Sequence, residues 1–386
     1  MISSYKKLGD YIQLVDDRNK DLEVKNLVGL TINKIFIPSV ANIIGTDMSN
    51  YKIIRKNQFA CSTMQVRRDK KMPLALYKND EPAIISQAYP IFEIIDAKEL
   101  LPEYLMMWFT RAEFDREACF HAVGGVRGSL EWDDFLDFKL PIPSLEKQQE
   151  IVNEYHTIQK RINLNYQLIN KLEETAQTIY KQWFVDFEFP DEYGKPYKSN
   201  GGKMVWCEEL EKEIPEGWNI NTIEDYCKIF TGNKDVNETV LDGKYTFFSC
   251  SPDTYLSNDY LYDGKVVLIA GNGSYTGRVN YFEGKFDLYQ RTYAIVSEND
   301  FLGFIYYLLK IEFEDVYLGG SRGSSIPYIV KGDISNFKIK YNLEIVEKFQ
   351  KIAELFLKNK EKCLNETQKL EELKELLLAK MTRVEN

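Results

Sequence analysis

The clearest pattern along the chain is a seam of apolar residues that recurs at alternating spacings of four and three. It lies in a segment from Ser144 to Phe184 that contains neither Gly nor Pro and follows the breaker Pro141-Ile142-Pro143. Ser144 occupies the position of an N-cap. The seam consists of Ile151, Tyr155, Ile158, Ile162, Asn165, Ile169, Leu172, Ala176, Ile179 and Trp183. Such a heptad seam predicts a long helix that pairs with another helix, interrupted by one polar residue, Asn165.

A second segment, from Asp333 to Asn386, also lacks Gly and Pro and shows the same spacing. Its seam consists of Phe349, Ile352, Phe356, Asn359, Cys363, Leu370, Leu373 and Leu377, with Glu366 as a break. Each segment of about 40 residues would form a helix ~60 Å long. We expect the two helices to pair antiparallel, because no third domain follows that the second helix would have to reach. The alternative is that each helix packs on its own globule.

The regions before each long helix have a different texture. Strand-like runs rich in Val, Ile, Tyr and Phe alternate with Gly, Asn and Asp, for example at residues 51–66, 83–95, 245–250, 265–270 and 288–296. Each region ends with a short helical stretch. This mixture predicts an α+β fold with mixed β-sheet and short helices in both globules, rather than a βαβ array.

An internal repeat connects these parts. The loop Gly124–Ser129 is matched 195 residues later by Gly319–Ser324, and Asp10-Tyr11 resembles Asp225-Tyr226. A short strand-like exit follows each loop, at residues 138–142 and 337–341. A repeat of this length indicates a duplicated domain. The expected order is therefore a globule at 1–143, a helix at 144–186, a connector and second globule at 187–340, and a helix at 341–386, forming a rod with pseudo-two-fold symmetry.

Composition excludes several classes of protein. The 386 residues include only two histidines, His121 and His156, which argues against zinc enzymes with several His ligands. The six cysteines form no C-x-x-C pair and are expected to be ordinary thiols. The N-terminus has no apolar signal region and no segment is long enough to span a membrane, so we expect a soluble, cytoplasmic protein.

No catalytic motif is found in the sequence. It has no Walker A loop, no Asn-Pro-Pro-aromatic or Asp-Pro-Pro-aromatic tetrad, and no nuclease-type Asp…Glu-x-Lys. The segment Gly271–Gly277 superficially resembles a nucleotide-binding loop, but its third Gly is one position late and no amphipathic helix follows. We interpret it as a hairpin whose small residues let a ligand approach the backbone.

The local distribution of charge differs from the total. The chain carries a net charge of -10, yet residues 51–80 carry eight basic and two acidic side chains, and the connector 191–225 carries nine acidic and four basic ones. This segregation is typical of a protein that presents basic loops to phosphate. Candidate contacts in the first globule are Lys52, Arg55, Arg67, Arg68, Lys70 and Lys71. The alternative is that residues 67–71 form a solvated hairpin tip.

The second globule has fewer cationic candidates. Arg278, Arg291 and Arg322 stand near Asn272, Ser274 and Tyr275, and these side chains suit base edges, Arg for guanine and Asn for adenine. Arg127 and Arg322 lie in the repeated Gly-rich loops. Either they contact DNA or they brace each globule against its helix.

The connector carries a family resemblance. The motifs Trp183-Phe184-Val185-Asp186-Phe187-Glu188-Phe189-Pro190, Gly194–Gly202 and Glu213-Ile214-Pro215-Glu216-Gly217-Trp218 resemble those of the specificity (S) subunits of bacterial type I restriction-modification systems. Leu140–Gln149, at the start of the first helix, is similar to the same family. The second copy departs at Lys338–Asn342, which lacks the Pro-x-Pro and Gln-Gln helix entry.

The resemblance implies a non-catalytic subunit with two target-recognition domains separated by two antiparallel helices. In such a protein each domain reads one half of a split, asymmetric double-stranded DNA target, and the helices set the gap between the halves. Two methylation (M) subunits would dock beside it, bind S-adenosylmethionine and methylate adenine at N6, while this chain holds no cofactor and no metal. Motor-nuclease (R) subunits are further partners that the resemblance allows. The competing hypotheses are a self-sufficient methyltransferase or nuclease and a coiled-coil scaffold that binds no nucleic acid.

Overall fold

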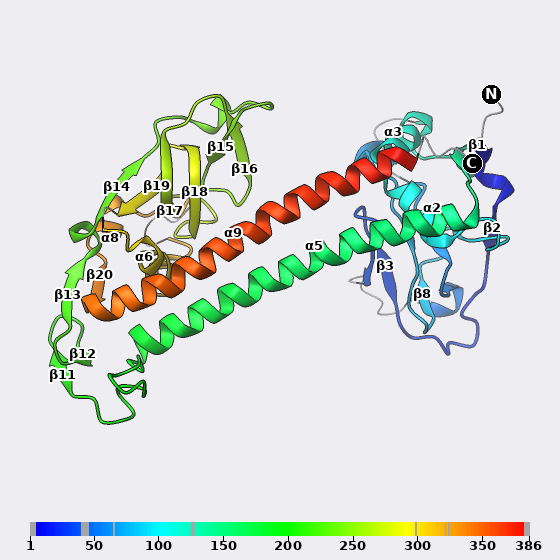
Figure 1. The fold of residues 1–386 in the computed structure, drawn as a ribbon. Coiled ribbons are helices and arrows are strands. Elements are labelled where there is room, and N and C mark those ends of the chain that lie inside the picture. The colour runs from blue at the N-terminus through cyan, green and yellow to red at the C-terminus, as the bar shows by residue number, and fades with distance from the viewer. Residues whose placement is uncertain are drawn as a thin grey trace. The chain divides into compact units, whose positions relative to one another are not determined.

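The structure is a computed structural model that describes residues 5–39, 46–64, 66–124, 128–297, 299–320, 322 and 325–381. The chain forms two compact units, shown with their elements in Figure 1. Unit 1 comprises Met1–Asn165 and Glu366–Asn386, and unit 2 comprises Tyr166–Asn365. Each unit therefore holds one globule together with a part of both long helices.

Unit 1 is built on short antiparallel strands. A four-stranded sheet has the order β2-β9-β6-β7, and three further pairs are β1-β10, β3-β4 and β5-β8. The strands are β1 (Tyr5–Lys7), β2 (Ile12–Val15), β3 (Val28–Leu30), β4 (Phe36–Pro38), β5 (Lys52–Ile54), β6 (Phe59–Cys61), β7 (Leu74–Leu76), β8 (Ala83–Ile85), β9 (Ile91–Ile94) and β10 (Lys139–Pro141). The expected strand-like run at 51–66 thus contains two strands, β5 and β6.

Four short helices cover this sheet. They are α1 (Val66–Asp69), α2 (Pro102–Thr110), α3 (Ala112–His121) and α4 (Trp132–Leu136). Pro102 starts α2, where its fixed φ suits the first helical position and no N–H is needed. The core is aromatic: Phe59 stacks on Phe92 with ring centroids 5.0 Å apart, and Phe109 packs edge-on against both. Burial of these rings ties α2 to the sheet.

Unit 2 contains a larger sheet of six strands. Its order is β14-β19-β17-β18-β15-β16, antiparallel except for the parallel pair β15-β18. The strands are β14 (Cys227–Thr231), β15 (Tyr245–Phe248), β16 (Thr254–Ser257), β17 (Tyr262–Ala270), β18 (Val279–Leu288) and β19 (Thr292–Ser297). Two separate pairs are β11 (Met204–Cys207) with β12 (Lys212–Pro215) and β13 (Asn219–Thr222) with β20 (Lys338–Tyr341).

Helices of unit 2 pack on one face of this sheet around Phe184, Phe304 and Phe349. They are α6 (Leu302–Leu308), a π-helical segment (Leu309–Phe313), α7 (Glu314–Tyr317) and α8 (Lys331–Ser335). The predicted run at 288–296 proves to be the end of β18, a turn and most of β19. The predicted α+β class with mixed sheets and short helices is confirmed in both units.

The two globules are closed in the same way, which confirms the internal repeat. In unit 1 the entering strand β1 pairs with the exit strand β10, and in unit 2 β13 pairs with β20. A 3-10 turn follows each entering strand and ends at Asp10 or Asp225, the residues matched in the sequence. The amide of Leu8 donates to the Phe138 carbonyl, and the amide of Ile223 donates to the Phe337 carbonyl. The repeat is therefore seen in the topology that closes each globule: an entering strand, a 3-10 turn and an exit strand paired with the entering one.

The first long helix agrees with the prediction. Helix α5 spans Leu145–Tyr180 and continues as a π-helical segment, Lys181–Val185. Ser144 caps it, since its hydroxyl accepts a hydrogen bond from the Lys147 amide at 3.4 Å. Every residue of the predicted seam is buried or half-buried, including Asn165, which is 2% exposed.

The second long helix, α9 (Leu343–Lys380), agrees with the predicted seam except at Leu373, and buries further residues outside it. Its buried positions are Val346, Gln350, Ala353, Leu357, Thr367 and Leu378, in addition to Ile345, Phe349 and Cys363. Leu373, placed in the predicted seam, is 49% exposed. Asn359, the asparagine of the predicted second seam, donates to the carbonyl of Leu355 in its own helix.

The helices run antiparallel within each unit. In unit 1 Gln159 meets Lys374 and Asn165 meets Thr367, so that rising numbers on α5 meet falling numbers on α9. In unit 2 Glu173 pairs with Lys360 and Tyr180 packs on Phe349. The predicted antiparallel pairing is confirmed within each unit.

Candidate nucleic-acid interface

Several loops meet beside one end of the six-stranded sheet in unit 2. The β17–β18 loop (271–278), the β18–β19 turn (289–291) and the described residues of a third segment (319–320, 322 and 325–329) are joined by backbone hydrogen bonds. The Gly271 amide donates to the Arg291 carbonyl at 2.9 Å, and the Gly273 amide donates to the Pro327 carbonyl at 3.0 Å. Gly319 donates to the Thr276 carbonyl at 2.9 Å. We call these three segments the loop cluster.

Two glycines of this cluster allow loops of the chain to approach one another, rather than allowing a ligand to approach the backbone as expected. A Cβ at Gly271 would lie 2.2 Å from the Arg291 carbonyl oxygen, and one at Gly277 would lie 2.3 Å from the Tyr317 carbonyl oxygen. These residues let loops of the chain approach one another. At Gly273, by contrast, a Cβ would have no atom within 4 Å, so the backbone is open there.

The cluster presents polar and aromatic side chains to solvent. Ser274 and Tyr275 are exposed, and Asn272 is half-buried in a β-bridge with Tyr328. Tyr328, 41% exposed, was not predicted from the sequence. A signal was present, because Ile326-Pro327-Tyr328 places two large side chains and a rigid proline directly after the second Gly-rich loop.

The three arginine candidates of unit 2 differ in what their side chains contact. Arg278 turns inward: its Nη2 donates to the Ser251 carbonyl at 2.6 Å, its guanidinium lies over the Tyr275 ring, and burial lowers its pKa. Arg322 forms an ion pair with Asp333. Arg291 is exposed, and no hydrogen bond or ion pair of its side chain is found among the described residues. Arg291 is therefore the best placed of the three for an external ligand.

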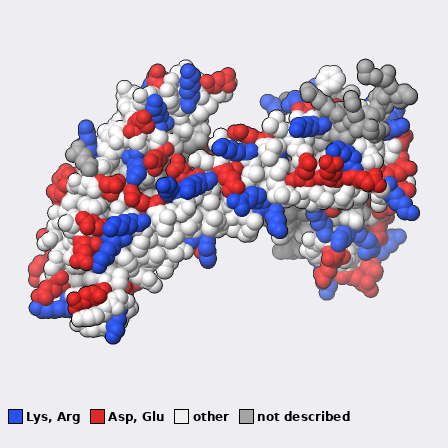
Figure 2. All heavy atoms as spheres, in the orientation of Figure 1, with Lys and Arg blue, Asp and Glu red and all other residues white. Residues whose placement is uncertain are grey.

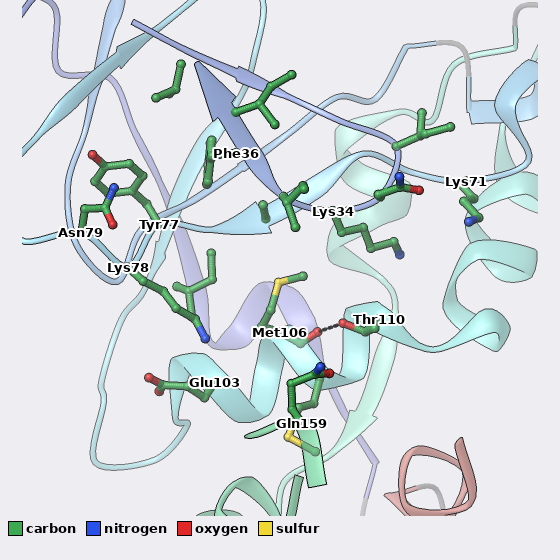
Figure 3. Close-up of a pocket in the computed structure, with 18 of the residues that line it drawn as sticks. Lys34, Phe36, Lys71, Tyr77, Lys78, Asn79, Glu103, Met106, Thr110 and Gln159 are labelled. Atoms are coloured by element: carbon green, nitrogen blue, oxygen red, sulfur yellow. Dashed lines mark hydrogen bonds between the residues drawn. The ribbon is translucent and has the colours of Figure 1, made fainter. Parts of the chain in front are cut away.

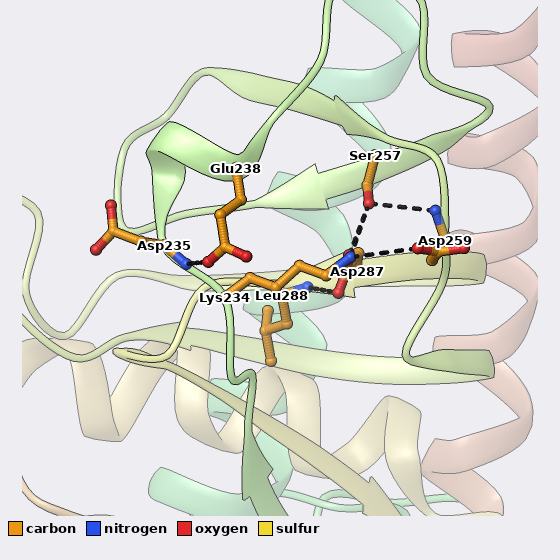
Figure 4. Close-up of polar contacts among 7 residues, drawn as sticks. All are labelled: Lys234, Asp235, Glu238, Ser257, Asp259, Asp287 and Leu288. Carbon is orange, nitrogen blue, oxygen red and sulfur yellow. Dashed lines mark hydrogen bonds and ion pairs between the residues drawn. The ribbon is translucent and has the colours of Figure 1, made fainter.

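The turn that carries Arg291 is held from behind by a polar network (Figure 4). The ammonium of Lys234 lies 2.6 Å from the buried carboxylate of Asp287, which also accepts the Ser257 hydroxyl at 2.7 Å. The hydrogen bond to Asp287 raises the pKa of Lys234. The Lys234 carbonyl in turn accepts the Gln290 amide at 3.0 Å. The network thus fixes the backbone next to Arg291, whose side chain is exposed.

In unit 1, part of the predicted basic segment is engaged within the protein. Lys52 is largely buried and donates to the Tyr89 carbonyl at 3.1 Å, and burial lowers its pKa. Arg55 pairs with Asp17 at 2.9 Å and Lys56 with Asp80 at 2.5 Å. The buried position of Lys52 therefore argues against its predicted role as a DNA contact.

The remaining basic candidates of unit 1 lie around α1. Arg67 donates to the Gly124 carbonyl at 2.8 Å, and so braces the Gly-rich loop. Arg68 forms a two-pronged ion pair with its neighbour Asp69. Lys70 and Lys71 are exposed, and Lys70 has a left-handed backbone with φ of 52°. Arg127 lies outside the described residues.

The distribution of charge does not form one continuous basic tract on the face shown in Figure 2. Basic and acidic side chains are interspersed over this face. Within the described ranges no group of three or more His, Cys, Asp and Glu side chains is arranged to hold a metal ion. No helix in the same ranges combines the length and apolarity needed to cross a membrane.

The sequence matches a family model twice. The model of the type I restriction modification DNA specificity domain covers residues 37–174 and again 215–375, one match for each globule and most of the long helix that follows it. The chain belongs to this family. Both copies of the internal repeat are thus specificity domains, and the predicted resemblance is confirmed.

Individual relatives carry the same description. The chain is 37% identical over 127 residues to the EcoDI specificity subunit of Escherichia coli, a match that covers 33% of this chain and 28% of that protein. It is 26% identical over 332 residues to the MjaIX specificity subunit of Methanocaldococcus jannaschii, covering 78% and 72% of the two chains. Its fold resembles the crystal structure of the type I restriction-modification S subunit from M. genitalium, with a TM-score of 0.61, 16% identity and coverage of 99% of this chain and 96% of that chain.

Proposed function

We propose that this chain is the DNA sequence-recognition subunit of a type I restriction-modification complex. The observation that carries the proposal is the double match to the DNA specificity domain, one match on each globule. Residues 1–143 would form the first target-recognition domain and 187–340 the connector and second one. Each would read one half of a bipartite, asymmetric target.

The long helices, residues 144–186 and 341–386, would set the gap between the half-sites and dock the methylation subunits. Large apolar side chains on their outer faces support a docking role: Leu164, Leu168, Leu355, Leu364, Leu373 and Leu376 are all at least 46% exposed. In unit 1, a cavity of about 570 Å³ is lined by Ile158, Leu373 and Leu376. Exposed apolar area of this kind is typical of an interaction surface.

The chemistry would belong to the partner subunits. S-adenosylmethionine binding, extrusion of the target adenine and N6 methylation are assigned to them. Motor-nuclease subunits would add cleavage of unmodified DNA. This chain would supply recognition without catalysis, in agreement with a sequence in which no nucleotide-binding or nuclease motif is found.

The direct test is methylome sequencing of a host with and without this chain, in the presence of its methylation subunits. We expect N6-methyladenine at one bipartite sequence that disappears when the chain is removed. Methylation scattered without a consensus would contradict the proposal. The isolated chain should show neither methyltransferase nor nuclease activity.

A further inference from the structure

A cavity of about 780 Å³ lies in unit 1, apart from most of the candidate DNA contacts (Figure 3). Its walls are the β3–β4 hairpin, the segment after β7, helix α2 and the first part of α5. Lys71 is the one lining residue that also belongs to the predicted DNA contacts. The size is within the range of about 300–1,000 Å³ that is typical of small-molecule sites.

The floor of the cavity is apolar and carries an aromatic ring. Val28, Leu76 and Met107 are buried beneath it, and Phe36 is half-buried. The Phe36 ring packs edge-on against Tyr77 with centroids 5.4 Å apart. Tyr77 is itself fixed, because its hydroxyl donates to the Glu81 carbonyl at 2.8 Å. Phe36 therefore offers a supported face for a planar, apolar ligand.

The hairpin wall is anchored by a buried lysine. The Lys34 ammonium lies 2.8 Å from the Asp115 carboxylate, with the Lys34 side chain 7% exposed, and it also donates to the Phe109 carbonyl. Asp115 accepts the Met72 amide as well, at 3.0 Å. Burial lowers the pKa of Lys34, partly opposed by Asp115. Lys34 is thus engaged in holding the wall and is not available to a ligand.

Two other lysines on the rim are available. Lys71 and Lys78 are exposed, and no hydrogen bond or ion pair of either ammonium group is found in the part of the chain that the structure describes. Lys56, in the same basic segment, is paired with Asp80. Glu103 supplies one opposing carboxylate. With Lys34 offset by Asp115, the lining retains a net positive charge.

Amide side chains complete the rim. Asn33 and Asn79 line the cavity beside these lysines, and both are exposed. An amide offers a donor and an acceptor in a fixed geometry, which suits the edge of a nucleobase. An apolar floor, an aromatic face, amides and ammonium groups together match the parts of a nucleotide.

We propose that this cavity binds one nucleotide unit, with its base against Phe36 and its phosphate on Lys78, while Lys71 adds positive charge from the opposite side of the rim. A simple anion would make no use of the apolar floor, and a neutral apolar ligand would make no use of the lysines. Stacking on an aromatic ring is a general mode of base binding. The nucleotide is either free in solution or part of a DNA strand; the second source rests on the proposed function.

The proposal is tested by calorimetry on the full-length chain. The ligands are the four deoxynucleoside monophosphates, deoxyadenosine, inorganic phosphate and a short single-stranded oligonucleotide. The variants are Lys71→Gln with Lys78→Gln, and Phe36→Leu, which keeps an apolar side chain on the floor. The control is Lys20→Gln with Lys25→Gln, which removes the same charge from exposed positions of unit 1 that do not line the cavity.

We expect a monophosphate to bind more tightly than deoxyadenosine or phosphate alone. The double lysine variant should weaken that binding at least tenfold, Phe36→Leu severalfold, and the control less than twofold. If only the oligonucleotide responds in this way, the source is a DNA strand. If no ligand distinguishes either variant from the control, the proposal is wrong, whereas a sequence-specific methylome would still support the proposed function.

Discussion

Gln148 on α5 and Gln350 on α9 each place a buried amide oxygen on a backbone N–H at the start of a globule helix. Gln148 Oε1 accepts the Leu101 amide at 2.8 Å, and Gln350 Oε1 accepts the Phe304 amide at 2.9 Å. The first amides of a helix have no acceptor within it. The second copy thus retains the contact although its helix entry lacks the Gln-Gln motif, because Gln350 lies two turns inside α9.

Replacement of Gln148 should destabilise unit 1. In Gln148→Leu, the Leu101 amide and the carbonyls of Glu99 and Pro143 lose their partner in a buried site. Buried polar groups left unpaired typically cost about 1–3 kcal/mol. Thermal and urea unfolding should show this loss. Gln149→Leu, at an exposed position on the same helix, is the matched control and should change the free energy of unfolding by less than about 0.5 kcal/mol.

Removal of Glu173 should destabilise unit 2. Its carboxylate accepts Lys360 at 2.8 Å and the Tyr306 hydroxyl at 3.1 Å, and so joins α5, α9 and α6. In Glu173→Ala the largely buried lysine and the tyrosine hydroxyl lose their acceptor, for an expected loss of about 3 kcal/mol. Glu174→Ala breaks only the exposed Lys171–Glu174 pair and should cost less than about 0.5 kcal/mol. Equal losses in the two variants would contradict the role assigned to Glu173.

The same carboxylate should make stability depend on pH. Burial raises the pKa of Glu173, but the charge of Lys360 and the hydrogen bonds from Lys360, Gln177 and Tyr306 outweigh it, so the net pKa is lowered. A lowered pKa contributes stability that is present above the unfolded value, about 4.3, and is lost as the pH falls through the folded value. The difference in melting temperature between wild type and Glu173→Gln should therefore narrow on acidification from pH 6 to pH 3.

Arg291 and Arg278 should respond differently to substitution. Arg291→Ala should leave the melting temperature unchanged and reduce discrimination at one base pair, by about 1–3 kcal/mol if the guanidinium reads guanine. Arg278→Ala should lower stability, because the guanidinium donates to the Ser251 carbonyl from a partly buried position. Binding selection with randomised duplexes and differential scanning fluorimetry separate the two effects. Relaxed specificity only in the Arg278 variant would reverse this assignment.

Lys70 and Arg67 provide a further comparison in unit 1. If Lys70 contacts a phosphate, Lys70→Gln in the assembled complex should reduce the slope of log affinity against log salt by about 0.9, with no change in the preferred sequence. Arg67→Gln should instead expose the backbone near Gly124, whose carbonyl it holds, to faster hydrogen exchange. An unchanged salt slope for Lys70→Gln would mean that α1 ends in a solvated tip.

The first seam could be predicted from sequence because large apolar residues mark it at nearly every position. The second was predicted only in part. Its buried stripe includes Gln350, Ala353 and Thr367, which a search for large apolar residues passes over. In unit 2, α9 packs against α6 as well as α5, with Phe349 beside Phe304 and Tyr307. The buried face of α9 is therefore wider than a single seam.

The candidate site shows a similar division. The loop segments and their residue types were visible as Gly-rich repeats, but the contacts of each side chain were not. The sequence alone does not distinguish Arg278, Arg291 and Arg322. In the fold, Arg278 turns inward to the Ser251 carbonyl, Arg322 pairs with Asp333, and Arg291 is exposed. Lys78 was counted as a basic residue but not as a site residue, because the cavity that it lines is formed by segments distant in the sequence.

The closing strand pairs have a consequence for how such a chain can change. Because β1 pairs with β10 and β13 pairs with β20, each globule begins and ends at one short two-stranded ladder. Segments between the paired strands that do not pack on the long helices can therefore differ in length or sequence while the two ladder strands stay in place. A changed recognition surface between Lys7 and Lys139, or between Thr222 and Lys338, would have to keep the residues that contact α5 and α9, such as Leu101 with Gln148 and Phe304 with Gln350.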